Sequence, residues 1–138
     1  MQEATLRGLI SSLKPENDMS DHLEISTTER AICLRPVGWI HGTDYELIRP
    51  AVDALVEKKG SIRVLFEAEE FDGWTPAAMW EDMKLGTHHA KDMERIAFVV
   101  DRKWLEGLAA LCKVFTRAEV RTFHPDQIDE AKAWIDAD

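Results

Sequence analysis

The chain has few of the residues that phosphate-binding loops and disulfide frameworks need. None of its 7 glycines forms G-x-G-x-x-G or G-x-x-x-x-G-K-[ST], and no G-x-S-x-G elbow occurs, so nucleotide binding and serine hydrolysis are disfavoured. The two cysteines, Cys33 and Cys112, have no Cys or His partner close in sequence, so no zinc site is indicated. We expect both to be buried, reduced thiols of a cytosolic protein, and no motif requires a cofactor.

Positive charge and long apolar runs are also scarce. The chain has 17 Lys and Arg residues against 26 Asp and Glu residues, for a net charge of -9. This argues against nucleic acid as the main partner, because binding to phosphates needs a surplus of cations. No apolar run is long enough to span a bilayer, and Glu3 and Arg7 lie where a signal peptide would be apolar. The sequence therefore predicts a cytoplasmic protein.

The composition that remains is typical of one globular domain. Hydrophobic residues make up 45% and charged residues 31% of the chain, which suits a single core rather than disorder. We divide the chain into an N-terminal extension, residues 1–20, and a domain, residues 21–138, with Met19 as an alternative start. Helical spacing in the extension ends at a polar run that contains a proline. The apolar residues with that spacing are Leu6, Leu9, Ile10 and Leu13.

Hydrophobic periodicity along the domain alternates between strand and helix. Strands are expected near residues 23–27, 31–40, 61–67, 96–100 and 119–124, and helices near residues 43–59, 75–89, 101–115 and 125–135. The element order is ββαβαβαβα. Strands that alternate with helices form parallel sheets, and the first two strands form a hairpin. We therefore predict an α/β fold with a mixed, mostly parallel five-stranded sheet and helices packed around it.

Three local signals make sharper predictions. Pro36 cannot donate a ladder hydrogen bond, so the second strand should be an edge strand or bulge there. Thr43 and Glu46 have the spacing of a capping box, which predicts Thr43 as the N-cap of the first helix. Pro50 should kink that helix or restart it one turn in.

Two polar groupings are candidates for chemistry. Carboxylates follow the third strand, at the sheet edge where α/β proteins bind ligands; they suit acid–base work, a hard cation or a solvated acidic loop. The other grouping, at the end of the helix 75–89, suits a metal or a helix C-terminus. We favour the structural alternative for both, and predict no metal and no catalytic residue. The first grouping is Glu67, Glu69, Glu70 and Asp72, and the second is Glu81, His88, His89 and Asp92.

Tryptophan and methionine are concentrated in residues 71–83, which hold two of the five Trp and two of the five Met. Met79, Trp80 and Met83 share one face of the predicted helix. Such a face either packs in the core or forms an adaptable apolar surface for a ligand, a partner or a bilayer interface. The predicted ligand-binding residues are Trp74, Trp80, Met79, Met83, Phe71 and Tyr45.

An ordered set of motifs runs through the domain, from about Leu23 to Ile135. It consists of Gly38, Asp44-Tyr45, Pro50, Phe71-x-Gly73-Trp74, Trp80-Glu81-Asp82-x-Lys84-x-Gly86, His89, Arg95-Ile96-Ala97-x-Val99, Asp101-x-x-Trp104, Val120-Arg121-x-Phe123 and Ala131-x-x-Trp134. With this set the chain resembles the SpoIIAA-like family, bacterial proteins of STAS-like fold that are related in shape to CRAL-TRIO lipid-transfer domains.

The resemblance implies a non-enzymatic protein with one of two functions. In the first, which we predict, a hydrophobic small molecule or lipid binds in a pocket beneath the helix 75–89, which acts as a mobile lid, and peripheral membrane contact is compatible with it. In the alternative, the chain is a protein–protein regulator of the STAS type, with an exposed apolar patch and no cavity. Thr75 is the only hydroxyl where anti-sigma-factor antagonists carry a phosphorylatable serine, so no clear phospho-switch is implied. A homodimer through the same helix is compatible with both.

Overall fold

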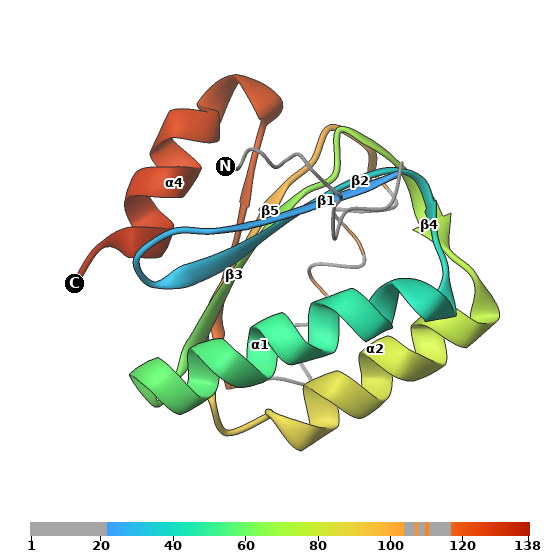
Figure 1. The fold of residues 1–138 in the computed structure, drawn as a ribbon. Coiled ribbons are helices and arrows are strands. Elements are labelled where there is room, and N and C mark those ends of the chain that lie inside the picture. Colours follow the sequence, from blue (N-terminus) through green and yellow to red (C-terminus); the bar gives the residue numbers. More distant parts are fainter. Residues whose placement is uncertain (1–21, 104–106, 108–109, 111–116) are drawn as a thin grey trace, which may run out of the picture.

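The computed structural model describes residues 22–103, 107, 110 and 117–138 (Figure 1). It begins with an antiparallel hairpin of strands β1 (Leu23–Thr27) and β2 (Ala31–Ile40), joined by a short turn at residues 29–30. Thr28 closes the turn, since its Oγ1 accepts a hydrogen bond from the Ala31 N–H at 3.0 Å. The hairpin makes the sheet mixed, as predicted.

Four further strands are added in parallel. Strands β3 (Ile62–Glu67), β5 (Met93–Val99) and β6 (Glu119–Phe123) continue the sheet in the order β1-β2-β3-β5-β6, and β4 (Glu70–Trp74) pairs with β2. The α/β class with a mixed, mostly parallel sheet is confirmed, and β6 lies at one edge of it. The predicted number of strands is wrong. The described residues form six, because residues 70–74, for which no strand is predicted, form β4.

Pro36 lies inside the sheet, at a point where β2 changes partner. β2 pairs with β3 over residues 31–34 and with β4 over residues 37–40. The Val37 N–H donates to His22 O at 2.7 Å on the β1 side, and N–H groups alternate sides along a strand. The missing N–H of Pro36 therefore faces the gap between β3 and β4, where no ladder bond is needed. The predicted edge position is wrong, and the register shifts two residues further along.

Helix α1 (Tyr45–Lys59) begins later than predicted. A 3-10 turn, Gly42–Asp44, precedes it, and the N-cap is Asp44, so the predicted capping role of Thr43 is wrong. The Asp44 side chain is buried, and its Oδ2 accepts a hydrogen bond from the His41 N–H at 2.7 Å. The carboxylate thus closes the 3-10 turn that precedes α1, and the N-cap residue makes no side-chain hydrogen bond to the helix itself.

Helices cover both faces of the sheet (Figure 1). α1 and α2 (Pro76–His88) lie side by side on one face, and α4 (Ile128–Asp136), which follows a 3-10 turn at Pro125–Gln127, lies on the other. α1 runs continuously through Pro50, so the predicted restart is wrong. The predicted core face of the helix at 101–115 lies outside the described residues; it comprises Trp104, Leu108, Leu111 and Phe115.

The two faces of the sheet carry separate hydrophobic cores. The larger core lies against α1 and α2, and includes Leu23, Ile32, Ile48, Val52, Phe66 and Leu85. The smaller core lies under α4, and includes Ala31, Cys33, Leu65, Ala97, Ala131 and Ile135. Cys33 is a buried free thiol, as predicted, and Cys112 lies outside the described residues. Within the described part of the chain, no helix has the length and apolarity to cross a bilayer.

Candidate functional site

Helix α2 begins where the sequence predicts. Thr75 is its N-cap, and the Thr75 Oγ1 accepts a hydrogen bond from the Ala78 N–H at 3.2 Å. Pro76 occupies the first helical position, where a missing N–H costs no hydrogen bond. The Thr75 N–H donates to Ile40 O at 2.9 Å, which fixes the start of the helix to the end of β2.

The inner face of α2 is fixed to α1 and the core. Two of its apolar side chains, Ala78 and Leu85, are buried. The Tyr45 Oη donates a hydrogen bond to Asp82 Oδ1 at 2.8 Å. Burial, and then the neighbouring Asp82 carboxylate, raises the pKa of the Tyr45 phenol well above its usual value, so the phenol stays a donor. These contacts determine which face of α2 remains outside.

The outer face of α2 is an exposed apolar surface. Met79, Trp80 and Met83 are 55%, 59% and 58% exposed. We name these three residues the α2 apolar patch. The alternative that this stripe packs in the core is wrong, because Ala78 and Leu85 occupy the inner face instead. Large apolar side chains that gather on a surface mark interaction sites more often than isolated ones do.

The other three predicted ligand-binding residues belong to the larger core. Phe71 is fully buried, Tyr45 is buried, and Trp74 is half-buried against the same cluster. The ring centroids of Phe71 and Trp74 lie 4.6 Å apart in a T-shaped arrangement. The pairing of β4 with β2 turns Phe71 inward. The structure thus divides the predicted six-residue site into a surface group and a core group.

A buried histidine joins α1 to the end of α2. His89 is 5% exposed, and its Nδ1 lies 3.0 Å from Asp92 Oδ2 and its Nε2 lies 2.7 Å from Asp53 Oδ1. Burial disfavours the charged imidazolium, but the two carboxylates outweigh that effect and raise the pKa of His89. The sequence places His89 near Asp92 but gives no sign of Asp53, because only the packing of α1 on α2 brings that residue close.

The residues of the alternative metal set have other partners. Glu81 Oε1 lies 3.0 Å from Arg49 Nη2, and Glu81 Oε2 lies 3.0 Å from Lys84 Nζ. Asp92 is hydrogen-bonded to His89. His88 is exposed beside them. Across residues 22–103, 107, 110 and 117–138, no group of three or more His, Cys, Asp or Glu side chains has an arrangement that could hold a metal ion.

Replacing His89 with glutamine should lower the free energy of unfolding by about 1.5–3 kcal/mol, the net value of hydrogen bonds to charged groups. The loss should depend on pH. Because the pKa of His89 is raised in the folded protein, its contribution is fully present below the unfolded pKa of about 6.5 and is lost as pH rises through the folded pKa. Urea unfolding of wild type and H89Q at mildly acidic and at alkaline pH measures the difference.

His88, the exposed neighbour of His89, provides the control for this experiment. His88→Gln should change the free energy of unfolding by less than about 0.5 kcal/mol at either pH, as is usual for surface positions. An H89Q loss that is equal at both pH values would contradict a role for the charged imidazolium.

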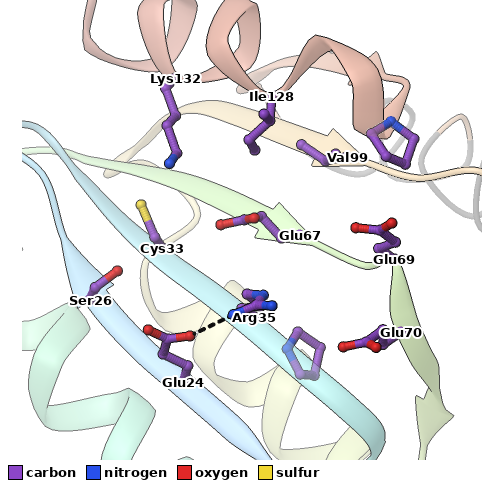
Figure 2. Close-up of a pocket in the computed structure, with 12 residues that line it drawn as sticks. Glu24, Ser26, Cys33, Arg35, Glu67, Glu69, Glu70, Val99, Ile128 and Lys132 are labelled. Atoms are coloured by element: carbon purple, nitrogen blue, oxygen red, sulfur yellow. Dashed lines mark hydrogen bonds and ion pairs between the residues drawn. The ribbon is translucent and has the colours of Figure 1, made fainter.

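Three of the four carboxylates at the end of β3 and after it lie at a cavity on the α4 face of the sheet (Figure 2). The cavity has a volume of about 330 Å³ and is bounded by β1, β2, β3 and α4. Glu67, Glu69 and Glu70 line it, whereas Asp72 pairs with Arg102 at 3.4 Å. Its lining is mainly polar, and it lies on the face opposite α2. It is therefore not the apolar pocket predicted beneath the helix 75–89.

The Cys33 thiol also lines this cavity (Figure 2). Burial, and then the Glu67 carboxylate, raises the pKa of the thiol, so it stays protonated near neutral pH. A protonated thiol is a poor nucleophile. On the β1 side, Arg35 is held by Glu24 at 3.0 Å. The cavity therefore presents carboxylates rather than an activated nucleophile.

The arrangement of the sheet and helices defines the class of the protein, a STAS-like α/β domain. The solved structure of an uncharacterized protein from Shewanella loihica PV-4 with a SpoIIAA-like fold matches with a TM-score of 0.68 and 25% sequence identity, over 86% of this chain and 98% of that chain. The anti-sigma factor antagonist SpoIIAA in its unphosphorylated form matches with a TM-score of 0.53 and 10% identity, over 80% and 97%. The second likeness shows the fold alone.

The SpoIIAA-like family model matches residues 31–136. The chain belongs to the SpoIIAA-like family, which confirms the resemblance seen in its motifs. A search of curated protein sequences finds no match. The predicted relation to CRAL-TRIO domains finds no support in these comparisons, and the division of the chain after residue 20 stays a prediction.

Proposed function

We propose that this protein is a non-enzymatic regulator of the STAS type that binds a protein partner through the α2 apolar patch. The proposal depends on one observation: Met79, Trp80 and Met83 are each more than half exposed on a helix whose inner face is already occupied. SpoIIAA, which has the same fold, is an anti-sigma factor antagonist. A shared fold alone does not establish a shared function, so the patch carries the argument.

The charges beside the patch are largely paired. Glu81 is held by Arg49 and Lys84, and Asp82 accepts a hydrogen bond from Tyr45. Two cations, Arg49 and Lys84, balance the carboxylates of Glu81 and Asp82, so recognition depends mainly on apolar contact. A Trp flanked by two Met side chains fits an apolar groove, or the apolar face of an amphipathic helix, on a partner protein.

The hydrophobic-ligand interpretation has less support. It requires Phe71 and Tyr45 to line the same pocket as Trp80, whereas both are buried in the core with other side chains around them. The remaining three residues form a surface, which suits a protein or a membrane better than an enclosed small molecule.

We expect Trp80→Asp to weaken partner binding at least about 30-fold, because truncating an aromatic anchor in an interface typically costs about 2 kcal/mol or more. The tagged full-length chain and the variant are compared by pull-down from cells that express the protein, with quantitative mass spectrometry. Calorimetry with the purified partner then measures the Kd for each variant.

Ala54→Asp is the matched control, because it adds the same charge at an exposed position of α1, away from the patch. A partner lost by W80D and retained by A54D supports the proposal, whereas a partner affected equally by both variants contradicts it. Binding to phosphatidylglycerol vesicles that is lost in W80D, with no protein partner retained, would favour the membrane interpretation and overturn the proposal.

A further inference from the structure

A second exposed apolar surface lies at the end of β2. Val37 is 46% and Trp39 is 52% exposed, whereas the flanking Pro36 and Ile40 are fully buried. Side chains alternate along a strand, and Ile40 belongs to the larger core, so Val37 and Trp39 share the face that points away from that core. We name these two residues the β2 apolar pair.

The Trp39 ring is held in place by the backbone of β4. A Cβ added at Gly73 would lie 3.0 Å from Trp39 Cζ3, so the indole packs directly on a residue that has no side chain. A ring that is already fixed along one edge loses little conformational entropy when a partner covers the rest of it. The β2 apolar pair is therefore a preorganised contact surface.

Helix α4 covers a different part of this face. It packs on β3, β5 and β6, and the smaller core beneath it includes only Ala31 and Cys33 of β2. The cavity bounded by β1, β2, β3 and α4 comes next along β2, and Arg35 and Pro36 belong to its lining. Because Val37 directly follows Pro36, the cavity and the β2 apolar pair lie one after the other along the same strand.

The end of the cavity that adjoins the β2 apolar pair is acidic. Glu70 lines the cavity and is paired in register with Val37, and Glu69, the residue before it, also lines the cavity. Lys132, the cation that α4 contributes, lies at the other end, beside the Cys33 thiol (Figure 2). The apolar surface thus has carboxylates next to it and no cation of α4 between them.

The two carboxylates are exposed, and no ion pair within the part of the chain that the structure describes includes Glu69 or Glu70. The next carboxylate, Asp72, is paired with Arg102 and is not counted in this surface. Unpaired carboxylates beside exposed apolar area favour a partner that combines apolar contact with positive charge. We name Val37, Trp39, Glu69 and Glu70 the acidic β2 surface.

We propose that the acidic β2 surface docks a segment of a protein partner in which apolar side chains lie next to Lys or Arg side chains. The apolar side chains cover Val37 and Trp39, and the cations reach Glu69 and Glu70 where these line the cavity. The cavity volume of about 330 Å³ is at the lower end of the range for small-molecule sites, about 300–1,000 Å³, so it suits side chains of a bound segment better than a large ligand.

The charge of the whole chain supports a cationic partner. The net charge is -9, which attracts a basic segment over a distance and repels both a second copy of this chain and an anionic bilayer. The inference goes beyond the proposed function and is independent of it, because the acidic β2 surface contains no residue of the α2 apolar patch.

Selection from a library of short random peptides tests this docking. The peptides, displayed on phage, are selected against the full-length chain that carries Trp80→Asp, so that the α2 apolar patch is disabled. Enriched peptides are synthesised, and calorimetry measures the Kd of each for the wild-type chain and for the variants below. We expect enriched peptides that join aromatic or aliphatic residues to Lys or Arg, with a Kd that rises with salt concentration.

Two changes in the acidic β2 surface should weaken the binding of such a peptide. Trp39→Ala should raise the Kd at least about 30-fold, as truncation of an aromatic anchor usually does. Glu69→Gln with Glu70→Gln should raise it about fivefold, the combined effect of two exposed ion pairs. The matched control is Glu46→Gln with Glu57→Gln, which removes the same charge from exposed positions of α1 and should change the Kd by less than about twofold.

A second measurement leaves the surface unaltered. Addition of a selected peptide to the ¹⁵N-labelled wild-type chain should shift the indole N–H resonance of Trp39 and leave that of Trp134, which packs near Phe123, unchanged. No enrichment, enriched peptides without cations, a Kd or a Trp39 resonance that does not respond, or an equal loss of binding in the α1 control would each overturn the proposal. A dimer of the full-length chain that Trp39→Ala makes monomeric would also overturn it, because a second copy would then occupy the surface.

Discussion

Replacing Phe71 with alanine is expected to lower the free energy of unfolding by about 3–5 kcal/mol, the usual cost of deleting a buried phenylalanine ring. Phe71 is fully buried and packs edge-to-face on Phe66, with centroids 5.1 Å apart, and on Trp74. The substitution removes the transfer free energy of the ring and leaves a cavity that the surrounding core side chains can fill only in part. Since small domains are stable by about 5–15 kcal/mol in total, F71A should shift the urea midpoint strongly.

The matched comparison is Trp80→Ala. Tryptophan is larger than phenylalanine, yet Trp80 lies mostly in solvent, so its loss should change the free energy of unfolding by less than about 0.5 kcal/mol. Both residues belong to the set predicted to bind a ligand, and the pair of variants separates core from surface within it. A neutral F71A together with a costly W80A would contradict the division that the structure makes.

Phe71 also shows what sequence reasoning cannot supply. Residues 70–74 alternate polar and apolar positions only briefly, and Gly73 and the acidic residues before it are typical of a loop. They become a strand because β2 continues past Pro36 and offers a free edge, and because Gly73, which has no Cβ, lets the Trp39 ring pack on its backbone. Both causes are contacts between segments distant in sequence.

Features with local causes were predictable. Thr75 and Pro76 mark the start of α2 by themselves, and the inward positions of α4 follow from helical spacing, with Ala131 and Ile135 fully buried. At the start of α1, two neighbouring residues, Thr43 and Asp44, are both good caps, and only the 3-10 turn decides between them.

The candidate site is only partly predictable, because spacing is a local property and the packing of other elements is not. The spacing of Met79, Trp80 and Met83 placed them on one face of a helix, but spacing cannot tell whether that face is covered. The covering depends on Tyr45, whose bond to Asp82 helps to fix the other face of α2 against α1. The link from His89 to Asp53 depends on the same packing, and no sequence pattern indicates it.

Arg63→Met is expected to lower the free energy of unfolding by about 3 kcal/mol, because it removes hydrogen bonds to a charged group that are worth about 1.5–3 kcal/mol each. Arg63 is buried on β3 under the end of α4. Its Nε donates to Glu94 Oε1 at 2.9 Å, and its Nη1 donates to Ile135 O at 2.9 Å and to Ala137 O.

Two effects of this substitution oppose each other. Burying a guanidinium is costly, and replacing a whole buried ion pair with apolar side chains is often neutral or stabilising. Here only one partner changes, so the buried carbonyl of Ile135 loses its donor while Glu94, which is exposed, is rehydrated. The carbonyl also lies at a helix C-terminus, where a cation is favourable. The free-energy cost of the lost hydrogen-bond donor should therefore exceed the free energy gained when an uncharged thioether, rather than a guanidinium, is buried.

Arg121→Met, on the edge strand β6, provides the control. Arg121 is exposed and its guanidinium lies 4.8 Å from the centroid of the Trp134 ring, a contact worth about 0.5–1 kcal/mol at a surface. Urea unfolding should separate the two variants, and the amides of α4 should exchange faster with solvent in R63M only. If R63M were as stable as wild type, α4 would be held by its apolar face alone, because Ala131 and Ile135 remain buried whatever residue lies beneath its last turn.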